Sequence, residues 1–328
     1  MIYVFSFFLP LIFLLIFEPA IISFTEKNRV YDRPNRRKLH PSLTPLWGGL
    51  GIWIAIWVCL GLLVLFSRPV KTLLFQNLSI MKGIFLGSAV ILLTGLADDK
   101  NPLSPTTKLL AEIIAILLAV IYGVEITGFS LPFGKYIVLP RFTAIIVTVG
   151  WLLVFTNVIN LIDGIDGLAS GISGIAAFTF SVVVLLEAHF GNIQGIELFA
   201  IFSLLLSGAC FGFLYFNFPP AGVFLGDSGS LLLGFLIGVI AIQGMLKLTA
   251  AIALIIPVIV VALPILDVLF AIVRRKKKQV PIMRPDSDHI HHRLLKSGWS
   301  HREIDLLMYN ITLILSMLAI LIAVFGLK

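Results

Sequence analysis

Charged residues are scarce in this sequence. Only 12% of its 328 residues are charged, where a soluble domain carries about a quarter, and the mean hydropathy is +1.06. Apolar runs of about 20 residues, the length that crosses a bilayer, recur along the chain. These features exclude an ordinary soluble domain. Because lipid offers no water to backbone polar groups, the spans must be helices, and we expect an all-α polytopic membrane protein.

Cysteine is also nearly absent, since the chain holds only Cys59 and Cys210. Both lie within apolar runs, which argues against a disulfide framework or a cysteine metal site. The first apolar run, 3–23, lacks the basic start and the small-residue cleavage site of a signal peptide, so we expect a retained span. The pI near 9.5 does not indicate nucleic-acid binding, because the positive charge is concentrated in two loops.

The apolar runs predict about ten transmembrane helices within a single integral-membrane domain, 1–328. The expected spans are 3–23, 47–66, 80–97, 106–122, 142–160, 168–187, 196–216, 229–246, 249–273 and 307–327. The connection 123–141 has β-type residues around a Pro-Phe-Gly turn and predicts a small hairpin.

The distribution of basic residues predicts the orientation. Loops 24–46 and 274–306 hold six and nine of the 24 lysines and arginines, and both lie on the same side of the predicted bundle. Cytoplasmic loops are enriched in such residues. The cytoplasmic connections are therefore 24–46, 98–105, 161–167, 217–228 and 274–306. Both termini and the hairpin are then expected outside.

Four polar motifs fall on that same predicted side. They are "LADDK" (96–100), "NLIDGIDGLA" (160–169), "FLGDSGS" (224–230) and "HIHHRL" (289–294). Scattered acidic residues would have fallen on both faces. The shared side indicates one site at the cytoplasmic ends of the spans.

The adjacent carboxylates of Asp98 and Asp99 repel each other, so a nearby cation is expected. Lys108, at the start of the next span, can supply part of that charge. Two alternatives stay open at this stage. The acidic pair also fits a solvated loop start, and the lysine fits one that snorkels to the interface.

Asp163 and Asp166 are three residues apart, and a glycine follows each. On a helix they would share a face. Carboxylates beside glycine backbone suit a hard cation that binds a phosphate. The alternative is that one of the two aspartates is the N-cap of the next span. That role does not account well for a second aspartate, nor for Asn157 and Asn160 nearby.

Asp227 lies at the mouth of a span, where it fits a helix N-cap and an anion site equally well. The histidine motif contributes His289, His291 and His292, followed by Arg293. The sequence has no second Cys or His cluster with finger-like spacing, which argues against zinc. The motif better suits hydrogen bonding to phosphate or base, with the arginine as an anion clamp.

Taken together, "LADDK…LSPTTK", "NVINLIDGIDGLA", "FNFPPAGVFLGDSGS" and "HIHHRL" resemble the polyprenyl-phosphate N-acetylhexosamine-1-phosphate transferases, the MraY/WecA family. The resemblance covers nearly the whole chain. The loop "DRPNRRKLHPSLTPLWGG" (32–49) resembles the WecA/TagO branch. Arg293 also resembles that branch, because it stands where the MurNAc-pentapeptide branch of the family carries a third consecutive histidine.

The resemblance implies Mg²⁺-dependent transfer of an N-acetylhexosamine 1-phosphate, usually N-acetylglucosamine 1-phosphate, from a UDP-sugar to undecaprenyl phosphate. UMP is released, and Mn²⁺ is a substitute metal. The implied location is the cytoplasmic face of a bacterial inner membrane, and a homodimer is a family-level expectation. The product starts a lipid-linked glycan such as O-antigen or teichoic acid. Direct attack by the lipid phosphate and a two-step aspartyl route both stay open.

The resemblance also suggests roles for the acidic residues. Asp163 is expected to be the principal Mg²⁺ ligand, and Asp166 and Asp227 support the metal or the donor. Asp98 contacts the lipid phosphate and takes its remaining proton if there is one. Asp99 sits beside it in the same acidic site.

The remaining motif residues are expected to bind the substrates. Lys108 and Arg293 offset phosphate charge, and Asn157 and Asn160 position ligands. The uridine diphosphate end of the donor is assigned to His289, His291 and His292.

Other functions are alternatives to this one. Within the family, the alternative is a phospho-N-acetylmuramoyl-pentapeptide transferase. A secondary transporter would place its acids near the bilayer midplane. A CDP-alcohol phosphatidyltransferase needs further aspartates on the same helix, whereas the next acid after Asp166 is Glu187. A structural subunit that kept the motifs without activity stays open.

Overall fold

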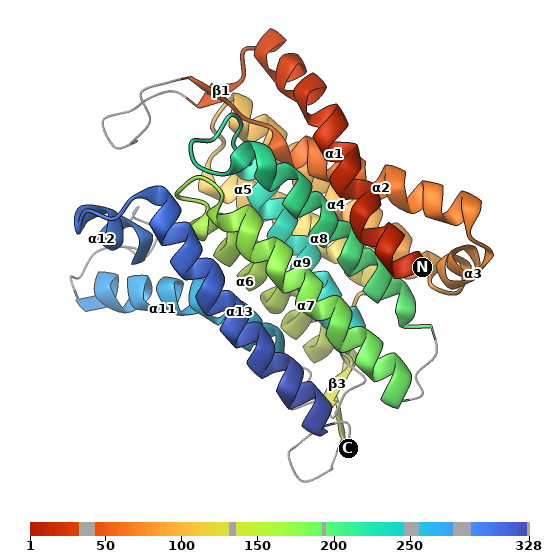
Figure 1. Ribbon diagram of the computed structural model, residues 1–328. Coiled ribbons are helices and arrows are strands. Elements are labelled where there is room, and N and C mark those ends of the chain that lie inside the picture. Colours follow the sequence, from red (N-terminus) through yellow and green to blue (C-terminus); the bar gives the residue numbers. More distant parts are fainter. Residues whose placement is uncertain (33–42, 131–135, 192–194, 246–255, 278–289, 327–328) are drawn as a thin grey trace.

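Helices make up almost the whole molecule (Figure 1). The computed structural model describes residues 1–32, 43–130, 136–191, 195–245, 256–277 and 290–326. The helices are α1 (Ile2–Lys27), α2 (Gly48–Phe66), α3 (Arg68–Gln76), α4 (Leu78–Lys100), α5 (Pro105–Ile121), α6 (Arg141–Ile162), α7 (Leu168–Phe190), α8 (Glu197–Asn217), α9 (Gly226–Met245), α11 (Ala262–Lys277), α12 (Ile290–Lys296) and α13 (His301–Gly326). The strands are β1 (Tyr31–Asp32), β2 (Thr44–Pro45), β3 (Gly128–Ser130) and β4 (Tyr136–Val138). The predicted all-α membrane fold is confirmed.

Eight of the described helices are long and apolar enough to cross a membrane. They are α1, α2, α4, α6, α7, α8, α9 and α13, and each matches a predicted span. The predicted span 106–122 corresponds to α5, whose 17 residues reach about 25 Å, less than the roughly 30 Å of hydrocarbon. The predicted span 249–273 falls partly on 246–255, outside the described residues, and its described part includes α11.

Three helices form the centre of the bundle. In the most apolar stretches of α7, α8 and α9, 83% of residues are buried, against 22% in α1 and 28% in α13. The peripheral helices therefore present large apolar side chains outward, as lipid contact requires. Small residues permit the close packing on which membrane helices depend. At Gly208 of α8, an added Cβ would lie 2.0 Å from the backbone oxygen of Phe7 in α1.

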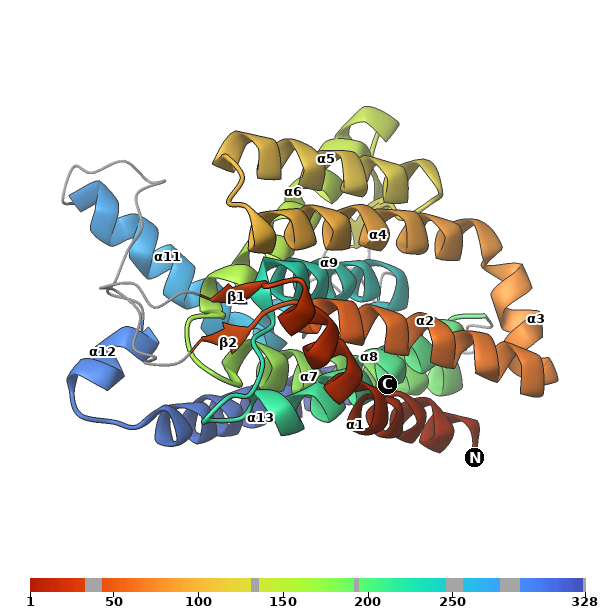
Figure 2. The same cartoon turned by 90° about the horizontal axis from the view of Figure 1, so that it is seen from above.

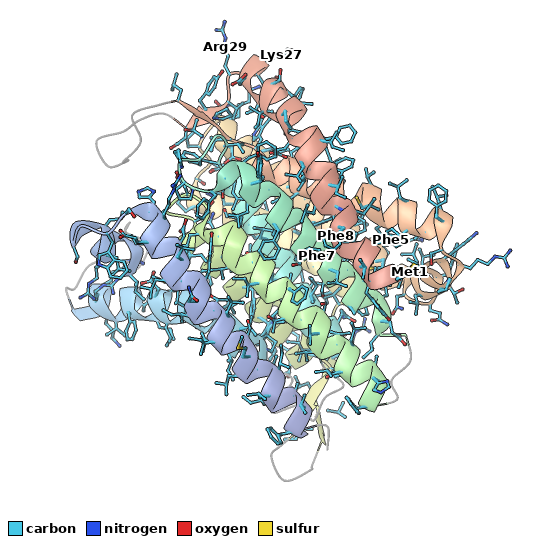
Figure 3. The ribbon with its side chains drawn as sticks, viewed as in Figure 1. Met1, Phe5, Phe7, Phe8, Lys27 and Arg29 are labelled. Atoms are coloured by element: carbon cyan, nitrogen blue, oxygen red, sulfur yellow. The ribbon has the colours of Figure 1, made fainter. Side chains whose placement is uncertain are left out.

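The two ends of the bundle differ in what they carry. The β1–β2 pair, the α4–α5 turn and α12 lie at one end, while the N-terminus and α3 lie at the other (Figures 1 and 2). Figure 3 places Lys27 and Arg29 at the β1 end of α1, and Met1 and Phe5 at its opposite end. Lys27 and Arg29, the described basic residues of the 24–46 segment, thus share an end with the aspartate motifs. The cytoplasmic assignment of that end stays a prediction.

The predicted hairpin is confirmed. Strands β3 and β4 pair antiparallel, with Gly128 opposite Val138 and Ser130 opposite Tyr136. Two short features were not predicted from the sequence. The β1–β2 pair places Tyr31 opposite Pro45, and α3 occupies most of the segment between the predicted spans 47–66 and 80–97.

Candidate active site

Asp98 and Asp99 lie in the last turn of α4, inside the helix and not in the following loop. The C-terminal end of a helix carries partial negative charge, so carboxylates there are electrostatically unfavourable. Two positively polarised groups from other helices face them. One is the ammonium group of Lys108, and the other is the N-terminus of α9.

The start of α5 places Lys108 in its first turn. The Ser104 hydroxyl accepts a hydrogen bond from the Thr107 N–H at 3.1 Å, and Pro105 opens the helix. The Lys108 Nζ then lies 3.1 Å from Asp98 Oδ2 and also pairs with Asp227. Asp98 Oδ1 accepts the Leu103 N–H at 2.7 Å. Lys108 is therefore the cation beside Asp98, and the acidic pair is not a solvated loop start, because both aspartates lie within α4.

The N-terminus of α9 binds the carboxylate of Asp99. Asp99 accepts hydrogen bonds from the backbone N–H groups of Asp227 at 2.7 Å and Ser228 at 3.3 Å. The start of α9 is therefore an anion site, which is one of the two interpretations of the sequence. The anion that it binds is the carboxylate of Asp99, a residue of the same chain. Gly226 makes the approach possible. Its φ is +68°, and an added Cβ would lie 2.4 Å from Asp99 Oδ2.

Asp227 is contacted from a third helix as well. The Asn160 side chain on α6 donates to Asp227 Oδ1 at 3.2 Å and to the Ser230 hydroxyl at 2.8 Å. Asn160 and Asp227, both predicted as site residues, are therefore together. The "LADDK", "NVINLID" and "FLGDSGS" motifs meet around Asp227.

Asp163 follows the last residue of α6 at the edge of this group and is half-buried. No hydrogen-bond donor in the described part of the chain contacts its carboxylate. Burial and the neighbouring carboxylates of Asp227, Asp99 and Asp166 raise the pKa of Asp163 well above its usual range. A carboxylate in such surroundings is stabilised by an added cation.

Asp166 is buried and joins two loops. Its Oδ2 accepts the Ala221 N–H at 3.0 Å, which links the 163–167 turn to the chain after α8. The N-cap of α7 is Gly167, without a side-chain cap, so the N-cap explanation of either aspartate is wrong. One carboxylate oxygen of Asp166 is therefore engaged in holding these two loops together.

Asn217 reinforces the same junction, and the sequence analysis missed it. Its Oδ1 accepts the Gly167 N–H at 3.1 Å and the Ser170 hydroxyl at 2.9 Å. Its Nδ2 donates to the Val223 oxygen at 2.8 Å. A polar residue at the end of an apolar run, two positions before a proline pair, was the available signal.

Glu112 is a second residue that the sequence analysis missed. It is buried on α5, one turn after Lys108. Its Oε2 accepts a hydrogen bond from Asn157 Nδ2 at 2.6 Å, and the same Nδ2 donates to the Leu153 oxygen at 3.0 Å. Because the amide nitrogen is engaged twice, the Asn157 oxygen is the atom left to accept from a ligand. An acid four positions after a lysine in an apolar span was the signal.

Helix α13 supports the aspartate turn from behind. The Tyr309 hydroxyl donates to the Gly167 oxygen at 2.7 Å. Asp305 lies one turn earlier and is fully buried, and within the described ranges neither of its oxygens has a hydrogen-bond partner. An added Cβ at Gly167 would lie 3.1 Å from Asp305 Oδ2. Neither residue was singled out from the sequence.

The histidine motif is described only in part. His289 lies outside the described residues, as do the side chains of His291 and His292. The first N–H of α12, from Ile290, donates to the buried Asp267 Oδ1 of α11 at 2.9 Å. Arg293 on α12 is exposed and forms no ion pair with a described residue, so its predicted role as an anion clamp stays a prediction.

The carboxylate set fits a magnesium ion that is held jointly with a substrate. Across the described ranges, no three Asp, Glu, His or Cys side chains converge closely enough to hold a metal by themselves. Mg²⁺ is usually bound by one or two carboxylates plus substrate phosphates and water. Asp163 and Asp227 are the candidates for those carboxylates. Lys108 is the only cation that pairs with the cluster among the described side chains.

Comparison with known proteins identifies the family. The glycosyl transferase family 4 model matches residues 81–245, which contain all three aspartate motifs. The chain belongs to glycosyl transferase family 4. The resemblance noted in the sequence is thereby confirmed.

Several known proteins match most of the chain. A probable undecaprenyl-phosphate N-acetylglucosaminyl 1-phosphate transferase of Bacillus subtilis is 35% identical over 97% of this chain and 84% of its own length. A decaprenyl-phosphate N-acetylglucosaminephosphotransferase of Mycolicibacterium smegmatis is 36% identical over 84% of this chain and 71% of its own. A phospho-N-acetylmuramoyl-pentapeptide-transferase of Campylobacter lari is 30% identical over 97% of this chain and 93% of its own length.

Proposed function

We propose that the protein transfers N-acetylglucosamine 1-phosphate from UDP-N-acetylglucosamine to undecaprenyl phosphate and releases UMP. Its relatives of 35% and 36% identity are named as phosphotransferases of this type, and the chain is an enzyme of the same type. The observation that carries the proposal is the double pairing of Lys108 with Asp98 and Asp227. It joins the "LADDK" and "FLGDSGS" motifs in one cluster.

The position of the cluster suits these two substrates. Asp98 and Asp99 end α4, Asp227 begins α9, and Asp163 lies between α6 and α7. All four are at helix ends, which is where a lipid phosphate at headgroup level and a soluble nucleotide can both reach. The same placement disfavours the transporter alternative, whose acids would lie near mid-span.

The proposed chemistry is displacement at phosphorus. An oxygen of the lipid phosphate forms a bond to the phosphorus that carries the sugar. The bond from that phosphorus to the UMP oxygen breaks, and UMP leaves with the electron pair. A phosphate monoester with a second pKa near 6 is mostly dianionic at neutral pH, so the nucleophile needs little deprotonation.

The residues of the cluster divide this work. Asp163 would be the main ligand of Mg²⁺, which when bound offsets the charge of the donor diphosphate. Asp227, whose oxygens already accept from Asn160 and Lys108, would support it. Lys108 adds positive charge beside the transferred group. Both oxygens of Asp98 are engaged, by Leu103 N–H and by Lys108. We therefore assign Asp98 mainly to positioning Lys108, and favour direct attack by the lipid phosphate over an aspartyl intermediate.

Two observations favour N-acetylglucosamine as the sugar. Relatives named for N-acetylglucosamine transfer are 35% and 36% identical, against 30% for the muramoyl-pentapeptide transferase. Arg293 occupies the position where the latter branch carries a third consecutive histidine. The polymer built on the product, whether O-antigen, teichoic acid or another glycan, is left open.

The test measures UMP release by the purified protein with undecaprenyl phosphate. UDP-N-acetylglucosamine, UDP-N-acetylgalactosamine and UDP-N-acetylmuramoyl-pentapeptide are offered separately, with Mg²⁺ or with EDTA. We expect turnover with the first donor only, its loss in EDTA, and loss in Asp163→Asn. Glu26→Gln, an exposed acid at the same end of the bundle, is the matched control. Turnover in EDTA, or near-normal turnover in Asp163→Asn, would refute the assignment.

A further inference from the structure

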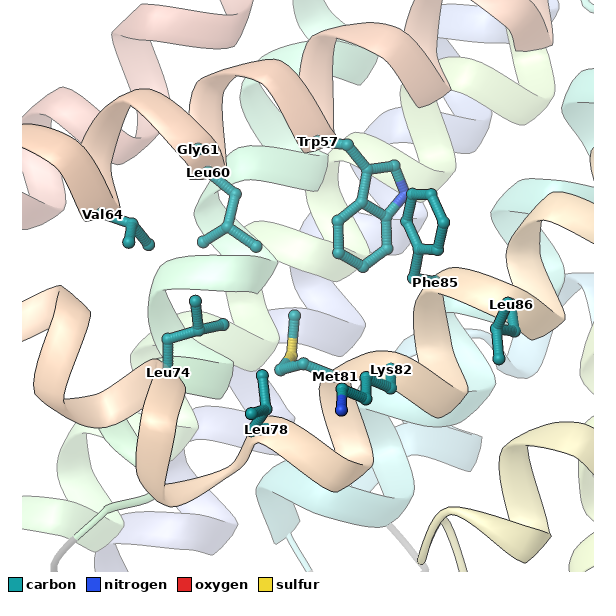
Figure 4. A pocket seen from close by; sticks show the side chains of 10 residues that line it. All are labelled: Trp57, Leu60, Gly61, Val64, Leu74, Leu78, Met81, Lys82, Phe85 and Leu86. Carbon is teal, nitrogen blue, oxygen red and sulfur yellow. The ribbon is translucent and has the colours of Figure 1, made fainter.

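An apolar cavity of about 480 Å³ lies between α2, α3 and α4 (Figure 4). Trp57, Leu60, Met81 and Phe85 contribute to its walls, and Lys82 is the only charged residue among those that line it. Its volume is within the range of small-molecule sites, about 300–1,000 Å³. The cavity lies toward α3 and the N-terminus, at the end of the bundle opposite the carboxylate cluster (Figure 1).

The cavity is open toward the outer surface of the bundle. Leu60 and Met81 are buried and form its floor, while the Phe85 side chain is 40% exposed. An added Cβ at Gly61 would meet no atom within 4 Å, so the space in front of this glycine is empty of protein. A groove of this depth between membrane helices suits a hydrocarbon chain.

One cation lines the cavity, and two more lie on α3, the helix that contributes Leu74 to its wall. Lys82 lies four residues into α4, about 6 Å along its axis, where a lysine side chain reaches the headgroup level. Arg68 and Lys71 lie on α3. The chain has no Asp or Glu between Ser67 and Asp98. No described acidic side chain pairs with any of the three cations.

We propose that this cavity binds a phospholipid with an anionic headgroup, such as phosphatidylglycerol. An acyl chain fills the apolar groove, and the phosphate pairs with Lys82, the charged residue of its lining. A polyprenyl tail is a poorer occupant, because it carries no charge at this end and would leave Lys82 without a counter-ion. A second copy of the chain would have to bring an acid into the groove. The proposal does not depend on the proposed function.

Native mass spectrometry of the purified full-length protein tests the proposal. The probe is an equimolar mixture of phosphatidylglycerol and phosphatidylcholine with identical acyl chains. We expect one phosphatidylglycerol retained per chain in preference to phosphatidylcholine. Lys82→Gln should weaken that retention about fivefold, as expected for one cation near a lipid surface, and Gly61→Phe should abolish it by filling the groove.

Two controls make the result specific. Gly150 on α6 also has no atom within 4 Å of an added Cβ, so Gly150→Phe adds the same ring elsewhere and should leave retention unchanged. Lys27→Gln removes an exposed lysine at the other end of the bundle and should do the same. Size-exclusion profiles identical to the parent show that each variant is folded.

Other outcomes would overturn the proposal. Equal retention of both lipids would show a groove filled without headgroup selection. Retention that survives Gly61→Phe would place the lipid elsewhere. If added undecaprenyl phosphate displaces phosphatidylglycerol from the parent protein, the groove belongs to the prenyl chain. If Gly61→Phe converts dimers to monomers whatever lipid is present, the groove is a subunit interface.

Discussion

Lys108 on α5 forms an ion pair with Asp227, 119 positions further along the chain. The same ammonium group contacts Asp98 at the end of α4. All three side chains are partly exposed, at 24% for Lys108, 26% for Asp227 and 15% for Asp98. One cation therefore joins two acidic motifs while still facing the solvent from which a substrate arrives.

Replacing Lys108 by glutamine should lower turnover strongly. The substitution keeps the length of the side chain approximately but removes the positive charge beside the transferred phosphate. Loss of one such stabilising group typically costs on the order of 10²-fold in rate. UMP release measures the effect. Lys27→Gln, at the same end of the bundle, should stay near the parent rate, and comparable losses in both variants would contradict a specific role.

Replacing Gly226 by alanine should separate Asp99 from α9. The new Cβ would lie 2.4 Å from Asp99 Oδ2, and the residue would have to hold a φ of +68°. We expect a loss of more than about 1 kcal/mol in the free energy of unfolding together with a loss of activity. In the neighbouring Gly222→Ala variant, the nearest atom to the Cβ lies at an ordinary 3.6 Å. Thermal unfolding should distinguish the two.

Glu112 is expected to act through Asn157. In Glu112→Leu, the Asn157 amide loses its 2.6 Å acceptor and no longer has a fixed orientation. Because supporting partners of this kind are worth about 10- to 100-fold, kcat/KM should fall by that order. Glu112→Gln retains an oxygen acceptor and should restore most of the activity. If Glu112→Gln loses as much kcat/KM as Glu112→Leu, the charge of Glu112 matters and the positioning role is wrong.

The stability of the metal-free protein should fall as the pH rises. The pKa of Asp163 is raised in the folded state by burial and by the carboxylates of Asp227, Asp99 and Asp166. The folded state then binds the proton more tightly than the unfolded state. The contribution of protonated Asp163 to the free energy of unfolding is present below the pKa of the unfolded state, near 3.9. It is lost as the pH rises through the pKa of the folded state.

Thermal unfolding in EDTA across this pH range measures that dependence. Asp163→Asn should flatten it, and Mg²⁺ should reverse the loss in the parent protein but not in the variant. The melting temperature of the parent protein in EDTA could instead vary with pH as little as that of the variant. That result would show that ionised Asp163 does not destabilise the fold.

The sequence alone predicted the class of fold and named several residues that the structure brings together. Apolar runs of bilayer length can form only helices in lipid, so the spans at α1, α2, α4, α6, α7, α8, α9 and α13 followed from hydropathy. Aspartates that interrupt such runs are costly unless they have a use. That is why Asp98, Asp163 and Asp227 were identifiable without a structure.

Residues whose importance lies in a partner far along the chain were not predictable. Glu112 and Asn217 each look like an isolated polar residue in an apolar run until Asn157 and Gly167 are placed beside them. Likewise, Asp99 could be assigned to the acidic site, but no pattern shows that it binds the N-terminus of α9.

The sequence by itself determined that this chain spans a membrane with its acidic motifs at span ends, because hydropathy and spacing are local properties. Only the tertiary structure decided which acids are free to act. Helix packing brings Lys108 to Asp227, engages Asp166 in a loop bond, and leaves Asp163 without a donor in the described part of the chain. Such pairings depend on distances between helices, and these are set by how the whole bundle packs.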